Sequence, residues 1–189
     1  MPQDAHEILV AAKADIWIAP VGTSLPTTES GALNGSFINL GYTSEDGTNL
    51  NYTQTTEEVM AHQTPDPVRR LRTGSAMTAV FNLLQFNQAS WELAFGGGTW
   101  SEPSPGSYRY DPPDENDALA EYAGVLDWED EDKKTRLVIP RGTVSEDVET
   151  TLARTAASVL PISLKALKPD NDDPAWYSIT NDPAFAEAS

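Results

Sequence analysis

The stretch Thr78-Ala-Val-Phe-Asn-Leu-Leu-Gln-Phe86 decides the fold, because it is the best strand candidate in the chain and leads directly into a helix. Its nine residues are mostly apolar and include β-branched and aromatic side chains, which is typical of a strand that packs in a core. Asn87 follows at once and is a suitable N-cap residue for a helix. Phe86, just before this cap, can pack against Trp91 one turn into the helix.

The helix that follows is short and has one aromatic face. Trp91, Ala94 and Phe95 stand at positions i, i+3 and i+4, which places them on the same side of a helix. Gly96-Gly-Gly98 then ends the helix, because glycine readily takes the left-handed conformation found after helix C-termini. We therefore expect a short helix that docks its aromatic face on a sheet.

Other short apolar runs, separated by turn-forming residues, predict further strands. They are 15–20, 36–42, 107–110, 122–128, 135–139, 158–167 and 176–180. The runs 122–128 and 135–139 form a hairpin with a charged turn, and Pro161 favours an edge position for the run that contains it. With six to eight strands and one clear helix, we expect a mainly β fold. Its two packed antiparallel sheets form a β-sandwich or barrel-like core with one short flanking helix.

Residues 43–76 do not fit this pattern of short apolar strands. The segment is long, polar and only weakly periodic, and Thr64-Pro-Asp-Pro67 should interrupt any regular element within it. Loops of this length in a compact domain are usually functional or disordered. We therefore expect a long exposed loop with a role of its own.

Composition excludes several classes of protein. The chain has 189 residues, enough for one domain, and its 12 basic and 29 acidic residues give a net charge of −17. Proteins that bind nucleic acid by neutralising phosphates need a basic face, which this chain can hardly offer. It has no cysteine, so disulfides, thiol catalysis and cysteine zinc sites are excluded. No run approaches the ~18 apolar residues that span a bilayer, and residues 1–10 lack the basic start of a signal peptide. We expect synthesis in a cytoplasm without export.

The charges are arranged in blocks along the chain. Residues 111–132 carry ten acids and no base, whereas 133–168 carry seven bases and three acids. Arg69, Arg70 and Arg72 form a local cluster in an otherwise acidic first half. Such blocks indicate either matching surfaces on neighbouring subunits or acidic loops that are simply solvated.

No residue pattern points to catalysis or to a bound cofactor. His6 and His62, the only histidines, stand in no recognisable motif, and the Ser-centred motif of hydrolases is absent. The acidic runs 127–132 and 170–173 lack the ordered spacing of a calcium loop. We therefore expect no enzyme activity, no catalytic or metal-binding residue and no cofactor. An acidic calcium- or carbohydrate-binding module stays open as an alternative.

Five segments together resemble a known family. They are Ile16-Trp-Ile-Ala-Pro-Val-Gly-Thr23, Phe37-Ile-Asn-Leu-Gly-Tyr-Thr-Ser-Glu-Asp-Gly47, Pro67-Val-Arg69, Thr78–Phe86 and Trp91–Gly96. In this succession the chain resembles the major tail proteins, or tail tube subunits, of long non-contractile-tailed bacteriophages. The resemblance covers roughly residues 14–100 by motif and the rest by strand pattern.

The resemblance implies a structural virion protein. Residues 1–189 would form a single tail tube domain, assembled in the host cytoplasm into hexameric rings whose inner sheets join in a continuous β-barrel. The rings would stack around the tape measure protein, with tail terminator and tail tip proteins as further partners. DNA would pass through the lumen without specific binding, and no membrane would be involved. Another β-rich virion protein, for tail completion or head decoration, is the alternative.

The resemblance also assigns roles to particular segments. The segment 43–76 would reach adjacent subunits or rings, and residues 1–13 and 181–189 would be flexible arms that order on assembly. The candidate subunit-interface residues are Arg69, Arg70, Arg72, Glu57, Glu58, Asp114, Glu115 and Asp117. The arginines would meet the acids of a neighbour and fix register. Some of the many acids would line the lumen, where they repel DNA phosphates.

Overall fold

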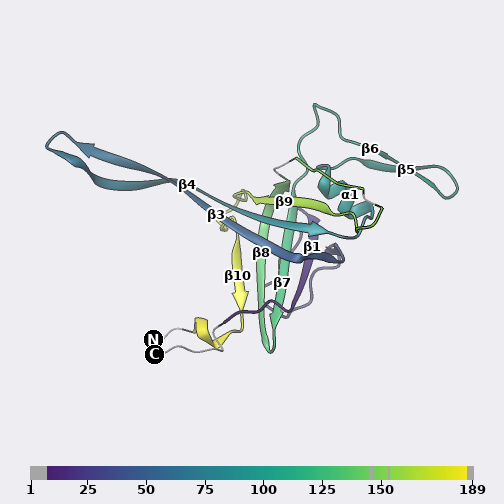
Figure 1. Ribbon diagram of the computed structural model, residues 1–189, viewed down its shortest axis with the longest axis horizontal. Coiled ribbons are helices and arrows are strands. Elements are labelled where there is room, and N and C mark those ends of the chain that lie inside the picture. Colours follow the sequence, from purple (N-terminus) through teal and green to yellow (C-terminus); the bar gives the residue numbers. More distant parts are fainter. Residues whose placement is uncertain (1–7, 145–146, 153, 187–189) are drawn as a thin grey trace.

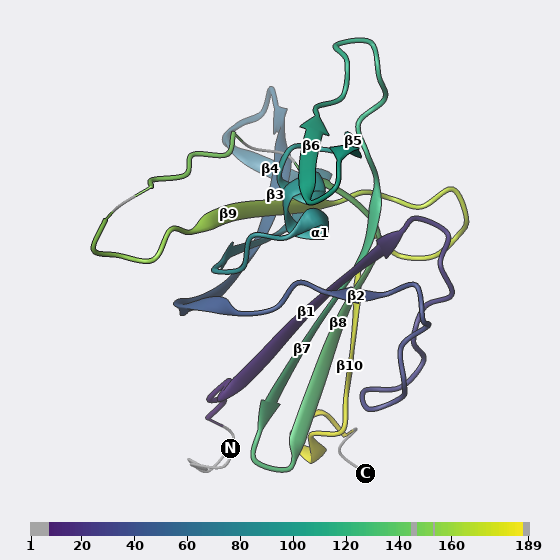
Figure 2. The same ribbon diagram turned by 90° about the vertical axis from the view of Figure 1, so that its right-hand side faces the viewer.

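The computed structural model describes residues 8–144, 147–152 and 154–186 (Figure 1). Parts of the expected terminal arms, residues 1–7 and 187–189, therefore lie outside the described residues. The two described ends come close together at the same side of the molecule (Figures 1 and 2).

The described residues form ten strands, one α-helix and one 3-10 helix. In chain order they are β1 (Lys13–Pro20), β2 (Ile38–Asn39), β3 (Thr43–Ala61), β4 (Thr64–Leu83), α1 (Gln88–Ala94), β5 (Thr99–Ser104), β6 (Ser107–Asp111), β7 (Tyr122–Asp130), β8 (Lys133–Val144), β9 (Leu160–Ala166), β10 (Tyr177–Thr180) and the 3-10 helix Pro183–Phe185. The expected mainly β, antiparallel fold with one flanking α-helix is confirmed. Of the predicted strands, 36–42 is reduced to the two residues of β2.

Eight strands form one antiparallel sheet in the order β2-β1-β7-β8-β9-β4-β3, with β10 also paired to β8. Strand β7 runs along one edge of β8. On the other edge, β10 pairs with Thr135–Val138 and β9 with Gly142–Val144. Because β8 changes partner along this edge, the sheet divides into two layers. The layer of β9, β4 and β3 crosses over the layer of β1, β7, β8 and β10 (Figures 1 and 2).

The main core lies between these two layers. Its fully buried side chains come from both layers, from α1 and from the segment after β2, and include Ile16, Leu40, Phe81, Leu83, Leu93, Leu137, Ile139, Leu160, Ile162 and Leu164. Each stabilises the fold by about 1.5–3 kcal/mol relative to an exposed position. A smaller cluster around Phe37, Val125 and Val138 lies on the opposite face of β1, β7 and β8, beneath the segment 21–37.

Strand β9 alternates as the sequence predicts. Its buried apolar side chains are Leu160, Ile162, Leu164 and Ala166, and Ser163 between them is also buried. The expected edge position is wrong, because β9 lies between β8 and β4. Pro161 nevertheless stands opposite Asn82 of β4, at a point that β8 does not reach. A residue without an N–H is therefore tolerated there, since among the described strands only β4 is a neighbour of β9 at that position.

Helix α1 begins as predicted. The Asn87 side chain accepts a hydrogen bond from the Ser90 N–H at 2.9 Å, and the Ser90 hydroxyl accepts one from the Asn87 N–H at 2.9 Å. This reciprocal pair is a capping box, which satisfies two N–H groups that the first turn leaves free. The rings of Phe86 and Trp91 lie 6.1 Å apart, as expected for a hydrophobic contact across the helix start.

Of the expected docking face of α1, only Ala94 is confirmed as buried in the core. The helix buries Ser90, Leu93 and Ala94, whereas Phe95 is 43% exposed. Trp91 and Phe95 instead pack against Tyr110 of β6, with ring centroids 6.3 and 6.0 Å away. The hairpin of β5 and β6 supplies aromatic partners for the large rings, and Ser90, Leu93 and Ala94 form the face of α1 that is buried.

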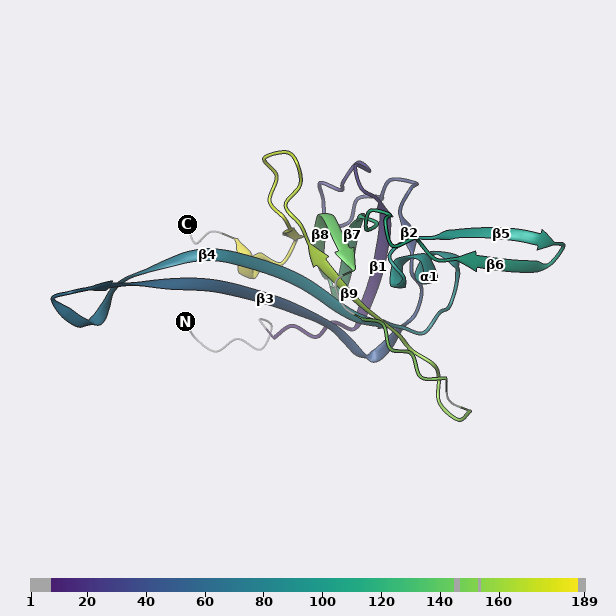
Figure 3. The ribbon, with the colours of Figure 1, turned by 90° about the horizontal axis from the view of Figure 1, so that it is seen from above.

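Residues 43–76 are regular β-structure, and the expectation of an irregular loop is wrong. They belong to β3 and β4, which pair with each other along nearly their whole lengths. Register shifts occur near the tip, around Val59 and Met60, and the Pro65 and Pro67 positions lie beside them. The exposure expected for this segment is confirmed. None of residues 53–75, hereafter the β3–β4 arm, is buried, and the arm projects far from the body (Figures 1 and 3).

Candidate subunit interface

The eight predicted interface residues fall into two separate groups, one on the projecting arm and one on the body beside α1 (Figures 1 and 3). Glu57, Glu58, Arg69, Arg70 and Arg72 lie on the β3–β4 arm. Asp114, Glu115 and Asp117 lie in the connection 112–121 between β6 and β7, beside the end of α1. The arginines and these acids therefore do not meet within one chain.

The register of β3 and β4 divides the arginine cluster between the two faces of the arm. Arg70 stands opposite Glu58, Arg72 opposite Thr56, and Arg69 opposite Val59. Because successive side chains of a strand point to opposite faces, Arg70 and Arg72 share a face that Arg69 does not. The Arg70 Nε lies 3.7 Å from a Glu58 carboxylate oxygen, and both side chains are exposed, so this pair stabilises the arm little.

The acidic group borders an open hollow of about 630 Å³ on the body. Asp114 and Asp117 line it together with Gly96–Thr99 and Asp111. The Asp114 N–H donates to the Asp117 carboxylate at 3.0 Å, which holds this turn in shape. Among the described residues, no base forms an ion pair with Asp114, Glu115 or Asp117.

Most bases of the block 133–168 form ion pairs within the subunit, which argues against the interpretation that this block matches a surface of a neighbour. Four of its bases form ion pairs inside the chain: Lys133 with Asp182 at 3.1 Å, Lys134 with Glu129 at 3.0 Å, Arg136 with Asp127 at 2.7 Å, and Arg141 with Glu121 and Asp170 at 2.7 Å each. The arginines of the arm are thus the better candidates for contacts between subunits.

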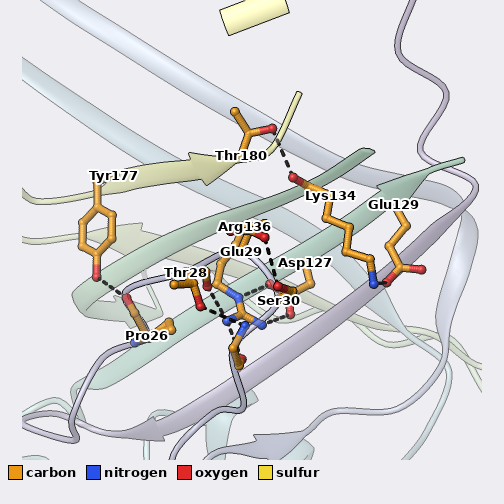
Figure 4. A network of polar contacts seen from close by, with 11 residues as sticks. Pro26, Thr28, Glu29, Ser30, Asp127, Glu129, Lys134, Arg136, Tyr177 and Thr180 are labelled. Atoms are coloured by element: carbon orange, nitrogen blue, oxygen red, sulfur yellow. Dashed lines mark hydrogen bonds and ion pairs between the residues drawn. The ribbon is translucent and has the colours of Figure 1, made fainter. Parts of the chain in front are cut away.

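Arg136 fastens the segment 21–37 to the sheet (Figure 4). Its side chain is only 5% exposed. Its Nε and Nη2 donate to the two Asp127 carboxylate oxygens at 2.7 and 2.8 Å, and its Nη1 donates to the carbonyls of Thr28 and Gly31 at 2.9 Å each. Hydrogen bonding to Asp127 holds the pKa of Arg136 above its ordinary value.

Sequence reasoning missed this pair and treated Asp127 and Arg136 only as members of charge blocks. The signal was present, because the two residues stand directly opposite each other in the predicted hairpin of β7 and β8. A second fastening of the same segment is the Tyr177 hydroxyl, which donates to the Pro26 carbonyl at 3.2 Å (Figure 4).

Asp182 and Lys133 fasten the C-terminal end. The Asp182 carboxylate accepts a hydrogen bond from the Ala184 N–H at 3.0 Å and so caps the 3-10 helix. This bond, together with Lys133, lowers the pKa of Asp182 below its ordinary value.

A shallow aromatic cleft of about 440 Å³ lies beside α1, at the end opposite to the arm. We define the aromatic cleft by four of its lining residues: Phe86, Trp91, Trp100 and Tyr108. Phe86 is 40% and Tyr108 70% exposed. The predicted helix face drew attention to Trp91 alone, because the contribution of β5 and β6 depends on how that hairpin folds back.

The described residues offer little for metal or membrane chemistry. No three histidine, aspartate or glutamate side chains among them are grouped so that they could hold a metal ion. His62 lies at the exposed tip of the arm, and His6 lies outside the described residues. No helix in the described part of the chain is both long and apolar enough to cross a bilayer.

The molecule is a small antiparallel β domain, and its long arm has no core of its own. This architecture is typical of a subunit of a larger assembly. Comparison with known families agrees, since the sequence model of the family described as "Phage tail tube protein" matches residues 1–189. The chain belongs to this family. It is a structural protein that self-assembles into the tube of a phage tail and is located in the virion tail. The resemblance inferred from the sequence is confirmed, and family membership sets aside the calcium or carbohydrate module and the other virion proteins.

Among solved structures, the chain is similar to a chain of one described as "Tail of empty GTA particle computed with helical refinement, C6 symmetry". The identity is 9%, the TM-score is 0.38, and the match covers 89% of this chain and 96% of that chain. No curated protein matches the chain.

Proposed function

We propose that the protein forms hexameric rings that stack into the tube of a long non-contractile tail. The tube forms in the host cytoplasm around a tape measure protein, and terminator and tip proteins close its ends. The subunit carries out no enzymatic reaction, and DNA passes through the lumen during ejection.

The observation that carries this proposal is the unsupported β3–β4 arm. Its outer strand extends roughly 25 Å from residue 53 to residue 61, at about 3.3 Å per residue. An isolated two-stranded hairpin is at best marginally stable in water. The arm also exposes four apolar side chains: Val59, Met60, Val68 and Leu71. A neighbouring subunit that covers these side chains stabilises an arm that its own body leaves bare.

Open sheet edges support lateral association. Strand β3 ends the sheet order on one side, and β2 ends it on the other. Among the described residues, β2 pairs only with Trp17 and Ile18 of β1 and the Leu40 N–H donates to the Ile16 carbonyl, so the rest of this β1 edge pairs with no strand. Unpaired edges present rows of backbone donors and acceptors that another chain can complete. Pairing of these edges between subunits would continue the sheet around a ring.

The charges support contacts between copies. Among the described residues, Arg69 and Arg72 form no ion pair, and the same is true of Asp114 and Asp117 on the body. These groups are therefore available for contacts with another copy. Such contacts fix the register of the assembly more than they add affinity.

The net charge of −17 suits a conduit for DNA. A basic lining would bind the phosphates and hold the DNA, whereas an acidic lining repels them. Several bases of the chain are already neutralised by acids of the same subunit. A tube structure with a neutral or basic inner wall would contradict this part of the proposal.

The arm can be tested by shortening it without changing the body. Thr55 stands opposite Gly74 in the register of β3 and β4, so residues 56–73 can be replaced by Asn-Gly, which favours a tight hairpin turn. We expect the variant to unfold at the same temperature as the parent monomer and to form no tubes by negative-stain microscopy. Ser24→Ala, an exposed substitution in the segment 21–37 that leaves the arm intact, is the control and should still form tubes. Normal tubes from the shortened variant would contradict the role of the arm.

A further inference from the structure

We propose that the aromatic cleft is the docking site for the tip of the β3–β4 arm of a second copy. The inference rests on the assembly proposed above and names the surface that receives the arm. Two exposed apolar surfaces, at opposite ends of the same chain, thereby cover each other in successive copies.

The aromatic cleft is already ordered in the free subunit. Two of its tryptophans pack against other aromatic rings. The ring centroids of Trp91 and Phe95 lie 5.0 Å apart, and those of Trp100 and Tyr110 lie 5.2 Å apart. The Tyr110 hydroxyl donates to the Gly97 carbonyl at 2.6 Å, which fixes the rings between α1 and β6. Rigid aromatic side chains give a large contact area with little loss of conformational entropy.

The tip of the arm carries the side chains that such a surface prefers. Met60 is 58% and Val68 56% exposed, and they lie on the two strands beside the turn. The thioether of methionine makes favourable contacts with aromatic rings, and the guanidinium group of arginine binds over their faces. Arg69 is next to Val68 in the chain and forms no ion pair among the described residues.

The cleft end of the subunit is acidic, and the arm carries arginine side chains that can contact its acids. The part of the chain from 86 to 121 carries seven acids and one base, Arg109. That base is already paired with Asp111, with 2.6 Å between Nη2 and Oδ1. The arm carries three of the twelve bases of the chain together with three acids, Glu57, Glu58 and Asp66, so it has no net charge. The two arginines that form no ion pair among the described residues, Arg69 and Arg72, are the groups that can meet the acids at the cleft end of another copy and fix the register.

The positions of the two surfaces favour a contact between copies. The arm and the hairpin of β5 and β6 project from opposite ends of the long axis, so an arm cannot reach the cleft of its own chain (Figures 1 and 3). A contact between two different surfaces of identical subunits repeats from copy to copy and generates rings or filaments. This is the kind of contact that a growing tube needs.

The absence of cysteine in the chain makes the contact directly testable. Val68→Cys and Tyr108→Cys subunits are mixed under tube-forming conditions and treated with a short bis-maleimide crosslinker. We expect a covalent dimer from the mixture, none from either variant alone, and a ladder of multimers when both substitutions are in one chain. Ser24→Cys, an exposed position in the segment 21–37, replaces Tyr108→Cys as the control and should give no dimer with Val68→Cys.

The outcomes separate this inference from the proposed function. If tubes form and Val68→Cys couples no better to Tyr108→Cys than to Ser24→Cys, the docking site is wrong and the tube assembly stands. If the parent chain forms no tubes under any condition, the assembly proposal fails instead.

A second measurement does not depend on crosslinking. Met60→Ser and Tyr108→Ser change exposed side chains, so each should leave the unfolding temperature of the monomer unchanged. Each should raise the critical concentration for tube growth roughly tenfold, as expected for truncating a contact at the centre of an interface. The double variant should be little worse than either single variant, because both remove the same contact. Effects that multiply would overturn the proposed pairing.

Discussion

Removal of the Arg136 side chain is the sharpest test of how the body is held together. Arg136→Met keeps most of the apolar length but deletes four hydrogen bonds and the partner of the Asp127 carboxylate. Breaking a buried ion pair by removing one partner costs about 3–5 kcal/mol. The Asp127 side chain is 24% exposed and can be partly rehydrated. We therefore expect the free energy of unfolding to fall by about 3 kcal/mol, at the lower end of that range.

The assay is equilibrium unfolding in guanidinium chloride, followed by the fluorescence of the five tryptophans. Arg136→Lys, which keeps the charge but not the forked geometry, should lose less than Arg136→Met. Amide hydrogen exchange should rise in the segment 21–37, which the guanidinium fastens, and stay unchanged where β4 pairs with β9. A loss below about 1 kcal/mol for Arg136→Met, or an unchanged segment 21–37, would refute the reasoning.

Three further substitutions test particular contacts. Burial raises the pKa of Tyr122 to about 12, so its contribution to stability is complete below about pH 10 and is lost as the pH rises toward 12. The free energy of unfolding is measured in denaturant titrations at pH 9 and at pH 11. Between these two pH values it should fall by about 1 kcal/mol less in Tyr122→Phe than in the parent chain, and an equal fall would contradict the assignment. Gly98→Ala should lower the melting temperature more than Gly97→Ala, because both have positive φ but only the Gly98 Cβ would stand 2.6 Å from the Tyr110 ring. Equal melting temperatures would argue against that close packing. Asn87→Ala should cost about 1 kcal/mol in chemical denaturation, as measured for other helix N-caps, and an unchanged midpoint would mean that the cap is dispensable.

Strands that bury one face could be predicted from the sequence, because apolar and polar residues alternate along them. Strand β9 was found in this way, whereas the hairpin of β7 and β8, which buries consecutive residues on both faces, was found as two apolar runs around a charged turn. The arm could not be recognised as a hairpin, since the pairing of its backbone leaves both faces in water and needs no hydrophobic pattern. Whether a sheet tolerates a proline also depends on which strands pair at that exact position. Pro161 is tolerated inside the sheet because β8 stops short of it.

The candidate interface was only partly accessible from the sequence. The charge blocks drew attention to Arg69, Arg70 and Arg72, but strand alternation divides them between two faces of the arm. The bases that follow Asp132 looked equally available, yet several of them neutralise acids across a turn or a sheet. The aromatic cleft was missed because its residues come from α1 and from a hairpin that folds back on it.

The exposed arm has a consequence for the genetics of the phage. Because residues 53–75 lie outside the core, substitutions in them should leave the free subunit as resistant to host proteases as before. Mutants of the core should instead deplete the subunit, since a loss of 1–2 kcal/mol can change abundance several-fold. Tailless mutants would then divide into two phenotypes. Lysates of arm mutants would contain full amounts of intact subunit alongside unjoined heads, and lysates of core mutants would contain little subunit at all.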